Sequence, residues 1–212
     1  MSEPGSSSST GSTDPAQPRQ GGDDGLSTPA ASDDPLSPRP SPHPPRLGVE
    51  LLLETPAAAD IDPPLDPWLA EQLARLAALS ALPGSEQGSV TLVVVDDPHM
   101  AALHERYFGD PTTTDVISFD LRDAGDAPLE GDLVLCLDEA QRQAQTRRHD
   151  VRMELLLYAV HGLLHLLGYD DHDPAEAERM HRLEDELLVR GGFNAVYGDN
   201  TPTENKSAKQ QE

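Results

Sequence analysis

The chain has 212 residues and a formal net charge of −23, with 15 Lys and Arg against 38 Asp and Glu. Affinity for phosphate groups comes mainly from basic side chains, so this balance argues against non-specific binding to DNA or to anionic membranes. Cys136 is the single cysteine, which excludes an internal disulfide and a zinc site made of several cysteines.

Residues 1–45 are dominated by Ser, Pro, Gly, Thr and Asp and hold few large apolar side chains. Such a segment cannot bury enough apolar surface to offset its ordering entropy, so we expect a disordered tail there and a second one over 196–212. The N-terminus lacks the basic and apolar regions of a secretory signal, and no apolar run reaches the length of a membrane span. We therefore expect a cytoplasmic protein with no membrane partner.

Residues 46–195 read as one α+β domain, because short apolar runs of strand type are mixed with longer helical patterns. We expect four strands, at 47–53, 89–95, 116–119 and 132–137. We expect five helices, at 67–79, 98–107, 139–148, 151–167 and 174–190. An aspartate precedes each helix as a potential N-cap, namely Asp66, Asp97, Asp138, Asp150 and Asp173.

The helix over 151–167 is apolar on nearly every side, so it should be central and buried, yet it carries two histidines. His161 and His165 are four residues apart and project from one face of a helix. Gly168 can end the helix in a left-handed conformation, and the chain can then bring His172 towards the pair. Two core histidines that satisfy each other would give the same His-x-x-x-His spacing. The third histidine favours a catalytic zinc ion, one per chain, with an open fourth position.

The residue after His161 separates the possible chemistries. Zinc peptidases place a glutamate there as the general base, whereas this chain has Gly162. Asp170 and Asp171 can orient a ligand histidine or accept a proton, and they can equally serve only to shape the turn.

Four ordered motifs resemble the YbeY family of bacterial metal-dependent endoribonucleases. The central one is His-Gly-x-Leu-His-Leu-x-Gly-Tyr-Asp over 161–170. The others are Val-Val-Val-Asp-Asp over 93–97, Thr-Asp-Val-Ile-Ser-Phe over 114–119 and Gly-Asp-Leu-Val over 131–134. The resemblance implies a small mixed sheet of about four strands packed with about five helices. It also implies a zincin-like central helix carrying the histidine pair.

Two positions depart from the family pattern. Members usually read Gly-Tyr-Asp-His, whereas here Asp171 stands between Asp170 and His172. The resemblance implies zinc ligands at His161, His165 and His172, with Asp171 as the alternative third ligand. An arginine of the family, linked to binding the RNA phosphate, is replaced by Phe108. Arg106 is either its substitute or a solvated helix charge.

The resemblance implies a zinc-dependent endoribonuclease of single-strand type, acting in small-subunit rRNA maturation and ribosome quality control. Metal-bound water would attack the phosphodiester, with His161, His165, Asp170 and Arg106 as the catalytic residues. Its partners would be rRNA, the small ribosomal subunit and ribosome-associated proteins, with no role for DNA.

A zinc-containing ribosome-assembly factor with little catalysis is the alternative. Eleven arginines face 29 Asp and Glu over 46–195, a net charge of −18, whereas RNA-binding proteins usually have a basic face. A hydrolase of another bond, including peptide bonds, is the third hypothesis, and Gly162 argues against it. Asp115 and Ser118 are candidates to line the cleft. We expect His149 at the surface, and Arg147, beside it, either touches phosphate or complements a helix dipole.

Overall fold

The computed structural model describes residues 47–85, 87–124 and 127–198. The tails expected at 1–45 and 196–212 lie outside the described residues, except for 196–198. Within the described residues the α+β class is confirmed, with one mixed sheet of four strands and five α-helices.

The strands are β1 (Gly48–Leu53), β2 (Gly88–Val95), β3 (Val116–Asp120) and β4 (Leu129–Cys136). They lie in the order β1-β2-β4-β3; β1 and β4 run parallel to β2, and β3 runs antiparallel to β4. β4 begins three residues earlier than the expected Asp132, because Leu129 and Glu130 already pair with β2. Gly131 permits this pairing, since a Cβ there would lie 2.8 Å from the Phe119 carbonyl oxygen and from Leu166.

The helices are α1 (Trp68–Ser80), α2 (Asp97–Phe108), α3 (Leu137–Arg147), α4 (Val151–Leu166) and α5 (Pro174–Arg190), with a short 3-10 helix at Pro56–Asp60. Asp150 and Asp173 cap α4 and α5 as expected, each accepting a hydrogen bond from a backbone N–H two residues later.

The other three caps were wrong. Pro67 rather than Asp66 precedes α1, and it makes no side-chain cap. α2 is capped by Asp96, whose carboxylate accepts from the His99 N–H. Asp138 lies inside α3 and accepts from the Asp97 N–H at 2.8 Å, so it joins the starts of two helices instead of capping one.

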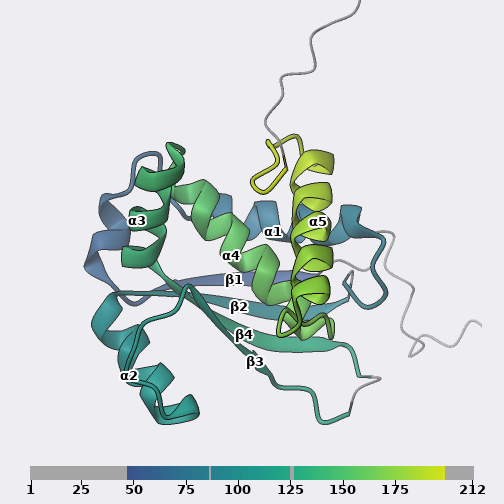
Figure 1. Ribbon diagram of the computed structural model, residues 1–212, viewed down its shortest axis with the longest axis horizontal. Helices are drawn as coiled ribbons and strands as arrows, with labels where there is room; N and C mark the ends of the chain where they lie inside the picture. Colours follow the sequence, from purple (N-terminus) through teal and green to yellow (C-terminus); the bar gives the residue numbers. More distant parts are fainter. Residues whose placement is uncertain (1–46, 86, 125–126, 199–212) are drawn as a thin grey trace, which may run out of the picture. The chain divides into compact units, whose positions relative to one another are not determined.

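The central helix is confirmed as α4, which packs on β3 and β4 and also contacts α1, α3 and α5 (Figure 1). Eleven of its residues are buried, and its leucines meet Leu92 and Val94 of β2 and Leu133 and Leu135 of β4 in one core. Each fully buried leucine contributes about 1.5–3 kcal/mol of transfer free energy, so this face fixes the position of α4.

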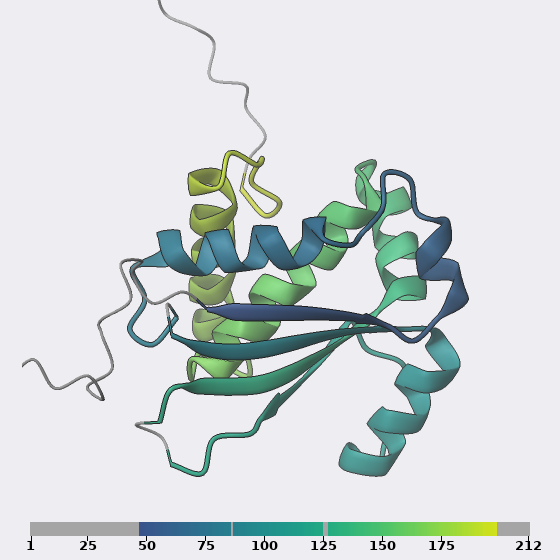
Figure 2. The same cartoon turned by 180° about the vertical axis from the view of Figure 1, so that it is seen from behind.

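α2 contributes to a smaller core on the other face of the sheet (Figure 2). There Met100 packs with Val95, Ile117, Val134 and Cys136. None of the helices in the described ranges has the length and apolar character needed to cross a bilayer.

Candidate metal centre

One face of α4 is polar although the helix is otherwise apolar. Glu154, Tyr158, His161 and His165 follow one another at spacings of four, three and four residues, so they share that face. Glu154 and Tyr158 are buried, and the side chains of His161 and His165 are 15% and 26% exposed. Polar groups in such a position need partners, and those partners define the site.

The two histidines bring their Nε2 atoms to 3.0 Å from each other. Nδ1 of His161 lies 2.6 Å from the Glu184 carboxylate, and Nδ1 of His165 lies 3.0 Å from the Tyr169 carbonyl oxygen. Both partners accept, so each Nδ1 carries the proton and each neutral ring presents its Nε2 lone pair to the other. Two lone pairs at this distance repel unless a cation lies between them. The pair therefore suits a shared proton or a metal ion.

Glu184 is a further candidate for the site, and it was not among the residues predicted from the sequence. It lies on α5, where Met180, Leu187 and Leu188 are also buried, and its side chain is fully buried. Its second oxygen, Oε2, has no hydrogen-bond partner among the described residues. A carboxylate within an apolar stripe at i, i+4, i+7 and i+8 was the signal that could have revealed it. Glu184 fits the carboxylate that commonly orients a metal-binding imidazole.

The surroundings of His161 favour positive charge. Burial by itself would lower the pKa of His161, but the hydrogen bond to the Glu184 carboxylate opposes this. The negative charges of Glu184, Asp115 and Asp171 act in the same direction, and the pKa is raised overall. Because a metal ion binds the neutral ring, metal binding at this site releases any proton held there.

The loop after α4 begins at Gly168, whose φ of 88° confirms the expected left-handed turn. It brings Asp171 to the histidine pair, with Oδ2 3.6 Å from His161 Nε2 and Oδ1 3.8 Å from His165 Nε2. His172, predicted as the third ligand, does not join this group. Its side chain is 85% exposed and its Nδ1 is hydrogen-bonded to Asp170, which is itself exposed.

Arg106 lies away from this group on α2, with its guanidinium 5.5 Å from the ring of Tyr107. Phe108 ends the same helix, with its side chain 62% exposed and its ring beside His104. Neither residue contacts the histidine pair among the described residues.

A polar cleft of about 310 Å³ opens at Tyr158, which precedes His161 by three residues on the same face of α4. It is lined by Thr113, Thr114, Asp115, Glu139, Gln143, Arg147, Tyr158 and Tyr197. Asp115 acts on the charge of His161, and the next residue, Val116, packs at Gly162, so the cleft and the pair are neighbours. The buried Tyr158 hydroxyl has no partner among the described residues, and burial raises its pKa.

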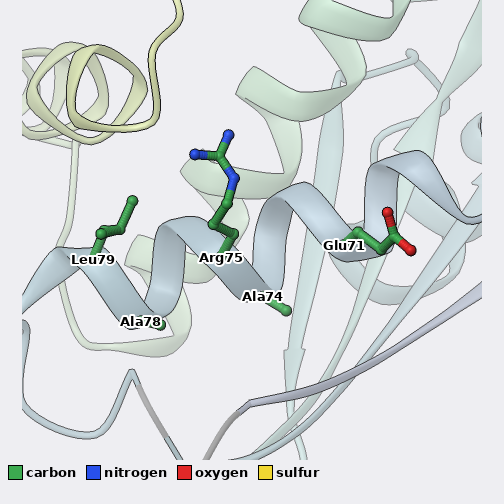
Figure 3. Close-up of a pocket in the computed structure, with 5 residues that line it drawn as sticks. All are labelled: Glu71, Ala74, Arg75, Ala78 and Leu79. Carbon is green, nitrogen blue, oxygen red and sulfur yellow. The ribbon is translucent and has the colours of Figure 1, made fainter.

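Asp115 and Ser118, the two residues expected to line the cleft, each make hydrogen bonds within the protein. Asp115 does line it, and its carboxylate also accepts from the Val116 N–H and the Thr114 hydroxyl, so it holds the loop in place. Ser118 donates to the Gly162 carbonyl oxygen at 3.3 Å. A larger hollow of about 600 Å³ runs along α1 beside Ala74, Arg75 and Ala78 (Figure 3), and none of the predicted site residues lines it.

Comparison with known proteins places the chain in a family. A family profile described as "Endoribonuclease YbeY" matches residues 61–192. Endoribonuclease YbeY of Anaeromyxobacter sp. (strain Fw109-5) is 45% identical over 120 residues, which cover 56% of this chain and 62% of that protein, somewhat under two thirds of its length. Endoribonuclease YbeY of Thermobifida fusca is 38% identical over 129 residues, covering 56% and 83%. A solution structure from Thermotoga maritima has 22% identity and a TM-score of 0.46, covering 66% and 89%. The chain belongs to the YbeY endoribonuclease family.

Proposed function

We propose that this chain is a zinc-dependent endoribonuclease that cuts single-stranded RNA. The observation that carries the proposal is the pair of Nε2 lone pairs of His161 and His165, 3.0 Å apart beside a polar cleft. Membership of the YbeY family supports RNA as the substrate. Imidazole nitrogens are ordinary zinc ligands, so the donor set fits the ion.

Each residue of the site would have a distinct task. His161 and His165 would hold the ion, and Glu184 and the Tyr169 carbonyl would keep both rings in the correct tautomer. When bound, zinc lowers the pKa of a coordinated water to about 7 and polarises a phosphoryl oxygen. Asp170, exposed on the loop, would accept a proton.

The cleft would position the RNA strand. The Tyr158 hydroxyl can donate to a sugar or phosphate oxygen of the strand, which would give this buried group a partner. The Arg106 guanidinium lies over the ring of its neighbour Tyr107, and its charge would be available to a phosphate outside the cleft.

The biological substrate we propose is small-subunit ribosomal RNA, processed in the cytoplasm during ribosome maturation and quality control. The net charge of −18 over 46–195 opposes tight binding to naked RNA. Ribosome-associated proteins would then supply the missing affinity, so cleavage should be more efficient on a ribosomal particle than on free RNA.

The alternative, a zinc-containing assembly factor with little catalysis, is favoured by one specific observation. Phe108 leaves an exposed apolar ring where the resemblance leads us to expect an arginine. Replacing Phe108→Arg separates the two readings. A large increase in cleavage rate would mean that the natural chain is a poor catalyst, and an unchanged rate would favour the enzyme.

The direct test compares RNA cleavage by the zinc-loaded full chain and by His165→Ala, with His99→Ala as a matched histidine control on α2. We expect a loss of at least about 100-fold for His165→Ala, because one of the few ligands is gone, and no loss for His99→Ala. Chelation should abolish the activity, and added zinc should restore it. Equal cleavage by His165→Ala and the natural chain would remove the proposal.

A further inference from the structure

We propose that Asp171, and not His172, is the third protein ligand of this centre, so that the metal is held by two imidazoles and one carboxylate. The inference rests on the proposed function for the presence of a metal and deepens it by naming the donor set. It changes both the expected affinity for different ions and the residue whose loss removes the metal.

The distances between the three candidate ligand atoms are close to those that a zinc ion requires. Ligand atoms at about 2.0–2.1 Å from zinc in a tetrahedron lie about 3.3 Å from one another. The three separations here are 3.0 Å between the two Nε2 atoms, 3.6 Å from His161 to Asp171 and 3.8 Å from His165 to Asp171. Each is within about half an ångström of that requirement. A small rotation of one carboxylate would complete the triangle.

The hydrogen bonds of the loop after α4 determine which of its side chains faces the histidine pair. Asp170 accepts from the backbone N–H of Asp171 at 2.8 Å and from that of His172 at 3.3 Å. The same carboxylate binds the His172 ring. These bonds direct Asp171 towards α4 and keep His172 outside, since its imidazole already has a partner and is 85% exposed. Recruiting His172 would require this turn to break.

The hydrogen bonds at the two Nδ1 atoms leave both Nε2 atoms facing Asp171. Both Nδ1 atoms of the pair are engaged with acceptors, so a metal adds to the two Nε2 atoms without rearranging the helix. At 3.6 and 3.8 Å the carboxylate is too far to hydrogen-bond to either nitrogen. Its negative charge therefore faces the same point as both lone pairs, which is where a divalent cation gains most.

A carboxylate in place of a third imidazole has a chemical consequence. Oxygen donors suit harder ions such as Mn²⁺ better than imidazole does, whereas three imidazoles suit zinc. Changing Asp171→His should therefore strengthen the preference for Zn²⁺ over Mn²⁺ relative to the natural chain.

The test measures metal binding by the full chain and needs no RNA. Zinc affinity is obtained by chelator competition, and the geometry by the visible absorption of bound Co²⁺. The matched variants are Asp171→Asn and His172→Gln, each keeping the size of the original side chain. We expect Asp171→Asn to weaken zinc binding by about 100-fold and to change the Co²⁺ spectrum. His172→Gln should stay within about threefold with an unchanged spectrum. Thermal unfolding of the metal-free variants should match the natural chain, because the side chains of Asp171 and His172 are 37% and 85% exposed.

Two results would overturn the inference while the proposed function survives. The first is loss of zinc in His172→Gln with retention in Asp171→Asn. The second is an equal loss in both variants, which would mean that both side chains bind. Failure of the natural chain to bind any zinc would instead remove the proposed function, a result that neither variant can imitate.

Discussion

Two glutamates, Glu154 and Glu184, have side chains with no exposed surface, and their partners differ in number. Glu154 accepts from Arg147 Nη1 with both oxygens at 2.9 Å and from His149 Nε2 at 2.5 Å. Glu184 accepts only from His161 at 2.6 Å, and its Oε2 has no partner among the described residues. Both carboxylates thus pair with histidine, and only one of them is fully satisfied.

The difference separates a network that is satisfied by its own residues from one that we propose to be functional. The Glu154 network ends on Arg147, the last residue of α3, and on His149 in the connection to α4, so it is complete without a ligand. The Glu184 network ends on two Nε2 lone pairs and a nearby carboxylate, and we propose that a cation completes it. A buried charge whose network lacks a final partner is therefore the better guide to a site in this chain.

Replacing Glu154→Gln should break the complete network and produce the largest loss of stability. One charge-assisted bond disappears, and an amide N–H₂ meets the Arg147 guanidinium, which we expect to cost about 2–3 kcal/mol of unfolding free energy. Urea denaturation of the metal-free chain measures this loss. Zinc affinity should remain within about threefold, since Glu154 does not touch the ligands. If Glu154→Gln has the same denaturation midpoint as the natural chain, the pairing of Glu154 contributes little to stability.

The same change at Glu184 should reverse the pattern. Glu184→Gln keeps an acceptor for His161 Nδ1 but removes the negative charge that raises ligand basicity, so zinc affinity should fall 10- to 100-fold. Unfolding free energy of the metal-free chain should change by about 1 kcal/mol or less, because an unpaired acceptor becomes an unpaired donor. Chelator competition and urea denaturation on the same two glutamine variants give the full comparison. A smaller effect on zinc than that of Glu154→Gln would contradict it.

The sequence predicted α4 and its histidine pair because both depend on local spacing. The apolar run and Asp150 define the helix, and the four-residue interval places His161 and His165 on one face. Glu184 lies 23 residues after His161 and reaches it only through the packing of α5 on α4. Helical periodicity within α5 contains no information about which helix that buried face will meet.

Short polar segments were the least predictable. The Asp170 bonds that turn Asp171 towards the pair depend on loop geometry, which residue identity alone leaves open. His149, expected at the surface, is only partly exposed, at 25%, because it shares the buried Glu154 with Arg147. The start of α1 was predicted to within one residue, but its Asp66 cap was wrong: the Leu65 carbonyl oxygen accepts from the Leu69 N–H, and no side chain caps the helix.

Gly162 follows His161 on α4 and packs on the sheet, and a methyl group there should have an intermediate effect. Its Cβ would lie 2.8 Å from Leu133 and 3.1 Å from Ser118 and Val116. Overpacking of this kind costs about 1–3 kcal/mol, and alanine returns about 1 kcal/mol of helix propensity, so Gly162→Ala should lose about 1 kcal/mol. Urea denaturation measures it. Adding Ser118→Ala relieves one contact and should recover part of the loss; no recovery would place the strain elsewhere.

Tyr158 lies between the two networks on α4, and its hydroxyl offers the finest test of the comparison. If the cleft receives RNA, Tyr158→Phe removes one hydrogen bond to the strand, about 0.5–1 kcal/mol, and lowers kcat/KM a few-fold. Unfolding free energy should stay within about 0.5 kcal/mol or rise, because the hydroxyl has no partner to lose in the free chain. Tyr107→Phe, on an exposed ring, is the matched control and should change neither quantity. Unchanged kcat/KM in Tyr158→Phe would separate the hydroxyl from the substrate. A clear loss of stability would instead assign Tyr158 to the structural network of Glu154.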